Sequence, residues 1–141
     1  MINDGLKMTG AVSIALNGKV VQEIPNLVVT AGKNFVASRM KDTTLAAMSH
    51  MALGTNNTEA LVGQTALSAE VTRGALTSTT VSTNTIAYVE TFAAGTGTGA
   101  IVEAGIFNAS SAGSMLCRTV FDVVNKSSLD AMTVTWTITV S

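Results

Sequence analysis

The segment 132–140, MTVTWTITV, decides the fold, because its side chains alternate strictly between apolar residues and threonine. Successive side chains of a β-strand point to opposite faces of the sheet, so this period of two predicts a strand with one buried face and one threonine-lined face. Trp136 lies in the middle of the apolar set, and we expect it in the core. A shift of one residue would place the indole in water, so the pattern also specifies the strand register.

An asparagine–glycine pair marks the first β-hairpin. Apolar residues alternate with smaller or polar ones over 12–16, up to Asn17 and Gly18. Both central positions of a type I′ turn need positive φ, and Asn-Gly is the pair that favours this turn most strongly. The return strand is expected at 19–24 and ends at Pro25, since proline has no N–H to donate to a strand ladder.

The rest of the chain continues the β pattern with one interruption. Helical spacing predicts one short helix near residues 31–40, with Thr30 as its N-cap. About eight short strands with turn signals between them predict a mainly β protein, an antiparallel β-sandwich of jelly-roll or immunoglobulin-like topology. The remaining strands are expected at 75–83, 85–93, 101–107 and 114–121, and 48–54 is a strand or an extended segment. A short apolar segment lies at 27–30.

The chain of 141 residues is expected to form a single β-sandwich domain at 11–141, preceded by an N-terminal arm at 1–10. The arm has no apolar periodicity, and such termini are poorly ordered unless another surface holds them. Its apolar side chains, Ile2 and Leu6, are our candidates for contact with a neighbouring protein. The stretch 59–74 stays open between a loop lying across a sheet and a short helix.

Charged residues make up only 12% of the chain, and the formal net charge is −1. Soluble domains carry about 25% charged residues, and mixed surface charge keeps them in solution. Two explanations remain open. Either threonine, serine, asparagine and glycine supply the polar surface, or much of the surface is an interface with other protein, where charge is depleted at the centre.

The sequence also excludes several partners. The eight basic residues are scattered singly, so we expect no direct nucleic-acid binding, which needs clustered cations. No apolar run reaches the length of about 18 residues that marks a membrane helix. The start, MINDGLKMTG, lacks the basic and apolar regions of a secretory signal. The single cysteine, Cys117, rules out a disulfide within the chain. We expect synthesis in the cytoplasm and no membrane partner.

No residue pattern indicates catalysis or metal binding. His50 is the only histidine, and in a strand its neighbour Ser49 would point to the opposite face, so the two are not expected to pair. One histidine and one cysteine give no cluster at metal-ligand spacing. The glycines of 95–99, GTGTG, precede a β-branched pair instead of a helix, which disfavours a phosphate loop. We expect a non-enzymatic protein without a cofactor or metal.

One acidic residue interrupts an otherwise apolar strand. Glu103 lies within 101–107, IVEAGIF, for which a central strand is expected. Either its carboxylate is exposed at a sheet edge, or it is buried and paired, because a buried charge without a partner is costly. Arg118 lies on the next expected strand, so we expect a structural ion pair between Glu103 and Arg118.

Four stretches carry a further pattern. They read EAGIFNASSAGSMLCRTVF at 103–121, MTVTWTITV at 132–140, NLVVTAGKNFVASRM at 26–40 and MALGT at 51–55. Together they resemble virion structural proteins of tailed bacteriophages, in which an E-x-G-[IL]-F strand, a turn, a strand ending in R-x-x-F and a final T-x-T-W-x-I strand recur. The resemblance covers about two thirds of the chain. The middle, about 56–84, matches no such pattern.

The resemblance implies a capsid decoration (cement) protein located in the virion, on the capsid surface. Its partners would be the major capsid protein, whose assembled shell it would stabilise, and further copies of itself in a trimer or dimer. The alternative is a tail, adaptor or fibre component, including one that binds a host receptor. A carbohydrate-binding or hydrolytic β-sandwich is weakened by the presence of a single tryptophan and a single tyrosine.

Overall fold

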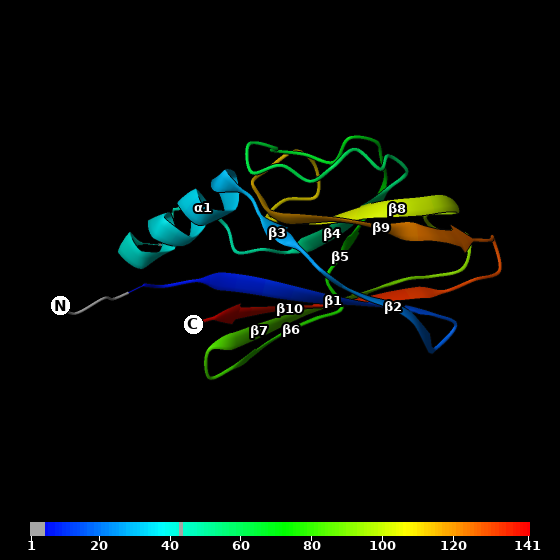
Figure 1. Ribbon diagram of the computed structural model, residues 1–141, viewed down its shortest axis with the longest axis horizontal. Helices are drawn as coiled ribbons and strands as arrows, with labels where there is room; N and C mark the ends of the chain where they lie inside the picture. The colour runs from blue at the N-terminus through cyan, green and yellow to red at the C-terminus, as the bar shows by residue number, and fades with distance from the viewer. Residues whose placement is uncertain (1–4, 43) are drawn as a thin grey trace.

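The computed structural model describes residues 5–42 and 44–141 and shows ten strands and one helix in this part of the chain (Figure 1). In chain order they are β1 (Met8–Leu16), β2 (Lys19–Pro25), β3 (Leu27–Val28), α1 (Thr30–Lys41), β4 (His50–Gly54), β5 (Glu70–Ala75), β6 (Ser78–Ser82), β7 (Thr85–Phe92), β8 (Gly99–Phe107), β9 (Met115–Lys126) and β10 (Met132–Val140). Two more strands are present than the eight or so expected.

The strands form two antiparallel sheets of five strands each. Sheet A has the order β2-β1-β10-β7-β6, and sheet B has the order β3-β9-β8-β4-β5. In Figure 1 sheet A lies below sheet B, and one hydrophobic cluster draws buried side chains from both sheets. The expected fold class, a mainly β antiparallel sandwich with one short helix, is confirmed.

The core between the sheets is built around β10. Trp136 stands opposite Val12 of β1 on one side and Tyr88 of β7 on the other. The indole is 0% exposed, and Val134 and Ile138, which share its face of the strand, are buried with it. Burying apolar surface contributes roughly 25 cal/mol per Å². The expected core position of Trp136 is therefore confirmed, together with the register of the strand.

The first hairpin closes at the predicted turn. Asn17 and Gly18 have φ angles of 52° and 83°, and a type I′ turn requires positive values at both positions. The side chain of Asn17 reaches the connection between β9 and β10, where its Nδ2 donates to Asp130 Oδ1 at 2.8 Å. Its Oδ1 accepts from Ala131 N at 2.9 Å. The β1–β2 turn is thus hydrogen-bonded to the β9–β10 connection, which lies far from it in the sequence.

Sheet B is covered on both faces. Its inner face packs on sheet A, and the loop 55–69, which we call the covering loop, passes over its outer face (Figure 1). A second apolar cluster lies on that outer side and contains Leu67 of the covering loop together with Ala52, Phe107 and Met115 of the sheet. No described element lies over the outer face of sheet A in Figure 1. The two sheets therefore differ in how much of them is available to other molecules.

Helix α1 packs closely against β9. A Cβ atom on Gly32 would lie 2.0 Å from the carbonyl oxygen of Leu116, so the helix backbone and the strand backbone are in contact. The helix starts one residue earlier than expected: Val29 is the N-cap, without a side-chain hydrogen bond, and Thr30 is the first helical residue. The prediction of Thr30 as N-cap was therefore wrong. The hydroxyl of Thr30 lies within the first turn instead of before it.

The N-terminal arm is shorter than expected. Strand β1 begins at Met8, because Met8 pairs with Val140 of β10, and the expected boundary after residue 10 is therefore wrong. The backbone of Lys7 also exchanges two hydrogen bonds with Ser141, at 2.7 and 2.9 Å. Leu6 is 75% exposed, and Ile2 lies outside the described residues.

Candidate functional site

Glu103 and Arg118 form a buried ion pair on the outer face of sheet B. Arg118 Nη2 lies 2.7 Å from Glu103 Oε2, and both side chains are 0% exposed. In the pairing of β8 with β9, Arg118 stands opposite Gly105, so the two charged residues are diagonal neighbours. Diagonal neighbours on one face of a sheet are within reach of long side chains. The expected ion pair is present, and Glu103 lies on an interior strand instead of an exposed edge.

The remaining hydrogen-bonding capacity of the pair is directed at the covering loop. The Glu103 carboxylate accepts from Ser68 N at 3.0 Å and Ala69 N at 2.7 Å. Arg118 Nη1 donates to Thr58 O at 2.8 Å. Both ends of the loop are therefore held by two residues of the sheet. The stretch 59–74 was open between a loop and a short helix. The structure shows a loop lying across the sheet as far as residue 69, whereas strand β5, which was not expected, begins at Glu70.

Two glycines leave room for this arrangement. A Cβ atom on Gly54 would lie 2.3 Å from Glu103 Oε1 and 2.6 Å from Ala69 O. On Gly105 it would lie 2.9 Å from a methyl carbon of Leu67. Any side chain at Gly54 would thus displace the carboxylate or the loop backbone. The ion pair therefore fixes the position of the loop. Both charged groups are buried and hydrogen-bonded, so neither is open to a substrate.

Two further cations hold loops in the same manner. Arg73 Nη1 donates to Ala109 O at 3.0 Å and Ala112 O at 2.8 Å, while its guanidinium lies 3.8 Å from the centre of the Phe107 ring. Lys126 Nζ donates to Ala93 O at 2.9 Å and to Asp130 O at 2.7 Å. In the sequence these cations were notable only for being scattered singly. These carbonyl partners are backbone groups, which leave no signal in a sequence. Arg73 also forms an ion pair with Glu70 of its own strand, at 2.7 Å.

This internal use of charge leaves a surface poorer in charge than the composition suggests. Of the eight basic residues, Arg118 and Lys126 are buried, and the side chain of Arg73 is 7% exposed. Of the nine acidic residues, Glu90 and Glu103 are buried. The molecule therefore presents fewer charged groups to solvent than its composition of 12% charged residues would indicate.

The outer face of sheet A is the part of the described surface where charge is absent over several neighbouring strands. On its three central strands the residues that point away from the core include no charged residue. We call this surface the threonine face, and its members are Thr9, Ala11, Ser13, Ala15, Thr85, Ala87, Val89, Thr91, Thr133, Thr135, Thr137 and Thr139. The expected threonine-lined face of β10 is thus the middle row of a surface that is uncharged over three strands. Glu23 of β2, which pairs with Ser13, stands at its border.

The single histidine is hydrogen-bonded to its neighbour, contrary to expectation. Ser49 Oγ and His50 Nδ1 lie 2.8 Å apart. Strand β4 begins only at His50, so the alternation of side chains in a strand does not apply to Ser49. A catalytic triad also requires an acidic group that orients the histidine. Among the hydrogen bonds of the described residues there is none between His50 and a carboxylate.

Burial affects two other groups that could serve as nucleophiles, a thiol and a phenol. Burial raises the pKa of the Cys117 thiol well above its usual range, and the side chain is fully enclosed. Burial likewise raises the pKa of Tyr88 to about 12. Thiols react as thiolates, so a buried thiol with a raised pKa is inert. Within residues 5–42 and 44–141, no group of three or more His, Cys, Asp and Glu side chains could hold a metal ion.

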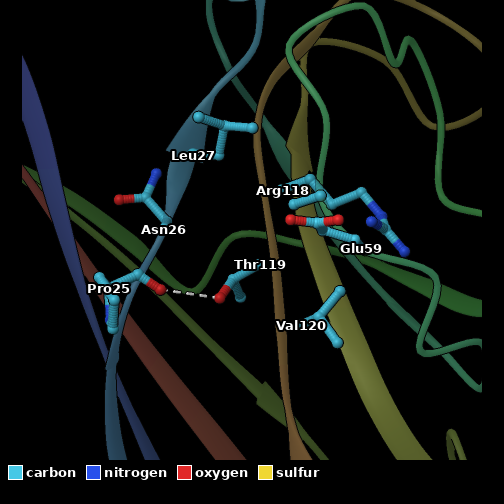
Figure 2. A pocket seen from close by; sticks show the side chains of 8 residues that line it. Pro25, Asn26, Leu27, Glu59, Arg118, Thr119 and Val120 are labelled. Carbon is cyan, nitrogen blue, oxygen red and sulfur yellow. Dashed lines mark hydrogen bonds between the residues drawn. The ribbon is translucent and has the colours of Figure 1, made fainter.

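A shallow hollow of about 320 Å³ lies beside the ion pair, between the 25–27 segment and β9 (Figure 2). Thr119 Oγ1 donates to Pro25 O at 2.8 Å and ties the two walls together, as the dashed line in Figure 2 shows. Glu59 of the covering loop lines the hollow, as does Arg118, whose guanidinium is already engaged. The hollow therefore offers apolar contact and one exposed carboxylate.

Comparison of the chain with protein-family models, with curated proteins and with solved structures gave no match. Helix α1, the one helix of the described part of the chain, is not long and apolar enough to cross a membrane. The described surface carries little charge. The buried cations Arg118 and Lys126 hold loops in place. The candidate functional site is accordingly a surface, the threonine face, and not a pocket.

Proposed function

We propose that this chain is a virion structural protein of a tailed bacteriophage, of the capsid decoration (cement) type. The observation that carries the proposal is the threonine face, an uncharged sheet surface on a chain that already has little exposed charge. Free-standing domains keep mixed charge on their surfaces, whereas the centre of a protein interface is depleted of it. A surface of this kind is suited to being covered by another protein.

The resemblance of four sequence stretches to phage virion proteins supplies the class of particle. Two of the residues within its motifs, Glu103 and Arg118, hold the covering loop on sheet B, and Gly105 lies beneath that loop. These motif residues thus have structural roles. The resemblance brings no catalytic residue with it, and a non-enzymatic role is part of the proposal.

The mechanism follows from mass action. A protein that binds the assembled shell of the major capsid protein, and not its free subunits, stabilises the shell by the free energy of binding. Many copies on a symmetric lattice let modest contacts add up. We propose that the residues before Lys7 contact a neighbouring subunit through Ile2 and Leu6. Lys7 itself is held by its hydrogen bonds to Ser141. The high exposure of Leu6 leaves it available for such a contact.

The number of copies in purified particles tests this proposal. A copy number close to that of the major capsid protein is expected, measured by quantitative mass spectrometry of intact virions. A handful of copies per particle would place the protein in the tail or its adaptor instead. Absence from washed particles would contradict both locations.

The threonine face can be tested by adding one charge to it. Thr135 lies at the centre of the face, opposite Ser13 on one side and Val89 on the other. In Thr135→Glu the carboxylate stays hydrated in the free protein, so folding is preserved, but it loses its hydration in an interface. Co-sedimentation with decoration-free shells should fall at least tenfold. Thr98→Glu adds the same charge on an exposed connection and should bind as the parent protein does. Equal binding by both variants would exclude the face.

A further inference from the structure

The two sheets of the described chain have four edge strands, and three of them are protected against pairing with another protein. Natural sheets protect their edges with charge, proline, bulges or very short strands. Strand β2 contains Lys19, Glu23 and Pro25 and has a register shift against β1. Strand β5 contains Glu70 and Arg73 and has a register shift against β4. Strand β3 has only two residues.

The fourth edge, β6 of sheet A, has none of these features within Ser78–Ser82, although Thr77, just before it, also donates its N–H to Val89 O at 2.7 Å. All five of its residues, Ser78–Ser82, are exposed, and its pairing with β7 is regular. The sequence contains no charged residue from 74 to 89, so the adjoining β7 adds none near this edge. Val81 is 70% exposed. An unprotected edge presents free N–H and C=O groups that another strand can use.

We propose that β6 pairs antiparallel with β6 of a second copy of this chain, so that the two A sheets become one continuous sheet. Ser82 pairs with Thr85 across a two-residue turn, which directs the backbone groups of Ser82 and Thr80 toward β7. The alternation of hydrogen bonds in an antiparallel ladder then leaves the backbone groups of Thr79 and Val81 at the open edge.

A two-fold axis at Thr80 satisfies all of these free groups. Thr79 then stands opposite Val81 of the second copy, and Val81 opposite Thr79 of the second copy, as hydrogen-bonded pairs. The two copies of Thr80 meet at the axis as a non-hydrogen-bonded pair, where the side chains are closest.

The side chains of this strand are suited to meeting themselves. Threonine–threonine and threonine–β-branched pairs across strands are favourable, and like charges directly opposite would be unfavourable. In this register STTVS presents Thr80–Thr80 and Thr79–Val81 pairs, flanked by Ser78–Ser82 pairs, and no charged pair. Because the same patch is used by both copies, the contact closes at two and does not propagate. The pairing would also place two threonine faces on one continuous sheet, although it stands independently of any role in a particle.

Val81→Pro is the first test, with Val81→Thr as its matched control. Proline removes the outward N–H of residue 81 and leaves the hydrogen bonds between β6 and β7 intact, a position at which edge strands tolerate it. Light scattering after size exclusion should give twice the 14.4 kDa chain mass for the parent protein and for Val81→Thr. It should give the single-chain mass for Val81→Pro, with an unchanged circular dichroism spectrum. A monomeric parent protein, a trimer, or a Val81→Pro variant that remains dimeric would overturn the proposal.

Crosslinking provides a test that does not depend on folding of the proline variant. Paired residues at the axis have Cα atoms about 4.5 Å apart, which is within the range of a disulfide. Thr80→Cys should therefore form a disulfide-linked dimer on mild oxidation in high yield. Thr98→Cys, exposed on a connection away from β6, should stay mostly unlinked, and Cys117 is buried and cannot contribute. Equal crosslinking of the two cysteine variants would refute the pairing at β6.

Discussion

Arg118 donates two hydrogen bonds to the same oxygen of Glu103, from Nε at 3.1 Å and from Nη2 at 2.7 Å, and neither side chain has any exposed surface. A buried ion pair adds little net stability, because both charges lose their hydration. Its value here lies in the backbone groups that it satisfies, since the carboxylate and the guanidinium also bind both ends of the covering loop. The pair therefore determines where the loop lies.

Replacing Glu103 by glutamine should lower the free energy of unfolding by about 3–5 kcal/mol, because Arg118 is left as a buried charge without its counter-ion. Urea denaturation measures this change. Hydrogen exchange should also show faster exchange at Ser68 and Ala69, whose amides lose their charged acceptor. Glu59→Gln, on the exposed part of the same loop, should be neutral. An unchanged stability of Glu103→Gln would refute the role of the pair.

The ion pair could be predicted, and the loop that it holds could not, for a physical reason. Glu103 stands out because a charge in an apolar strand needs a partner, and Arg118 is the nearest cation on the next strand. The loop ends are held through backbone groups of Ser68, Ala69 and Thr58, and every residue has such groups. A sequence pattern reports side-chain periodicity. It contains no record of which backbone groups meet a buried charge.

Contacts between residues far apart in the sequence also explain why the predicted ends of strands were wrong, whereas local patterns predicted register and turns. The strict alternation of β10 predicted its register, and Asn17-Gly18 predicted the turn. The start of β1 at Met8 depends on pairing with Val140, a contact between the two ends of the chain. The contact between Ser49 and His50 depends on where β4 starts, which its apolar residues do not specify. The threonine face was foreseen only along β10, because its other rows come from strands whose neighbours were unknown.

Gly32→Ala should detach α1 from β9. The added methyl carbon would lie 2.0 Å from the carbonyl oxygen of Leu116, and neither partner is a flexible side chain that could move aside. Overpacking typically costs about 1–3 kcal/mol, and contact with backbone places this variant at the upper end. Gly63→Ala is the control, because no atom lies within 4 Å of the added carbon. Thermal unfolding of both variants measures the difference, and equal melting temperatures would contradict the close packing of the helix.

Lys126→Met should destabilise the protein by about 1–3 kcal/mol, because the carbonyls of Ala93 and Asp130 lose their donor while the apolar stem is kept. Chemical denaturation measures the loss of stability. Amide hydrogen exchange should become faster in the β7–β8 and β9–β10 connections, which contain Ala93 and Asp130. Lys33→Met removes a cation from an exposed position of α1 and should change stability by less than about 0.5 kcal/mol. Equal stability of the two variants would show that the Lys126 ammonium does not hold the two connections in place.

Asp130 should make stability depend on pH in the acid range. Its side chain accepts hydrogen bonds from Asn17 Nδ2 and Ser127 N, at 2.8 Å each. The bond from the Asn17 side chain and then that from the Ser127 backbone lower the pKa of Asp130 below its ordinary value of 3.8. A group whose pKa is lower in the folded than in the unfolded state contributes stability above the unfolded value. That stability is lost as the pH falls through the folded value.

The change that isolates this effect is Asp130→Asn. Above pH 3.8 the variant should be less stable than the parent protein, and the difference should shrink as the pH falls further. Asn17→Gly removes the main donor but keeps a residue that tolerates positive φ in the turn, so its pH profile should move toward that of Asp130→Asn. Urea denaturation at a series of pH values measures both profiles. A stability difference between Asp130→Asn and the parent protein that stays constant as the pH falls below 3.8 would show that the hydrogen bonds do not act through the ionised carboxylate.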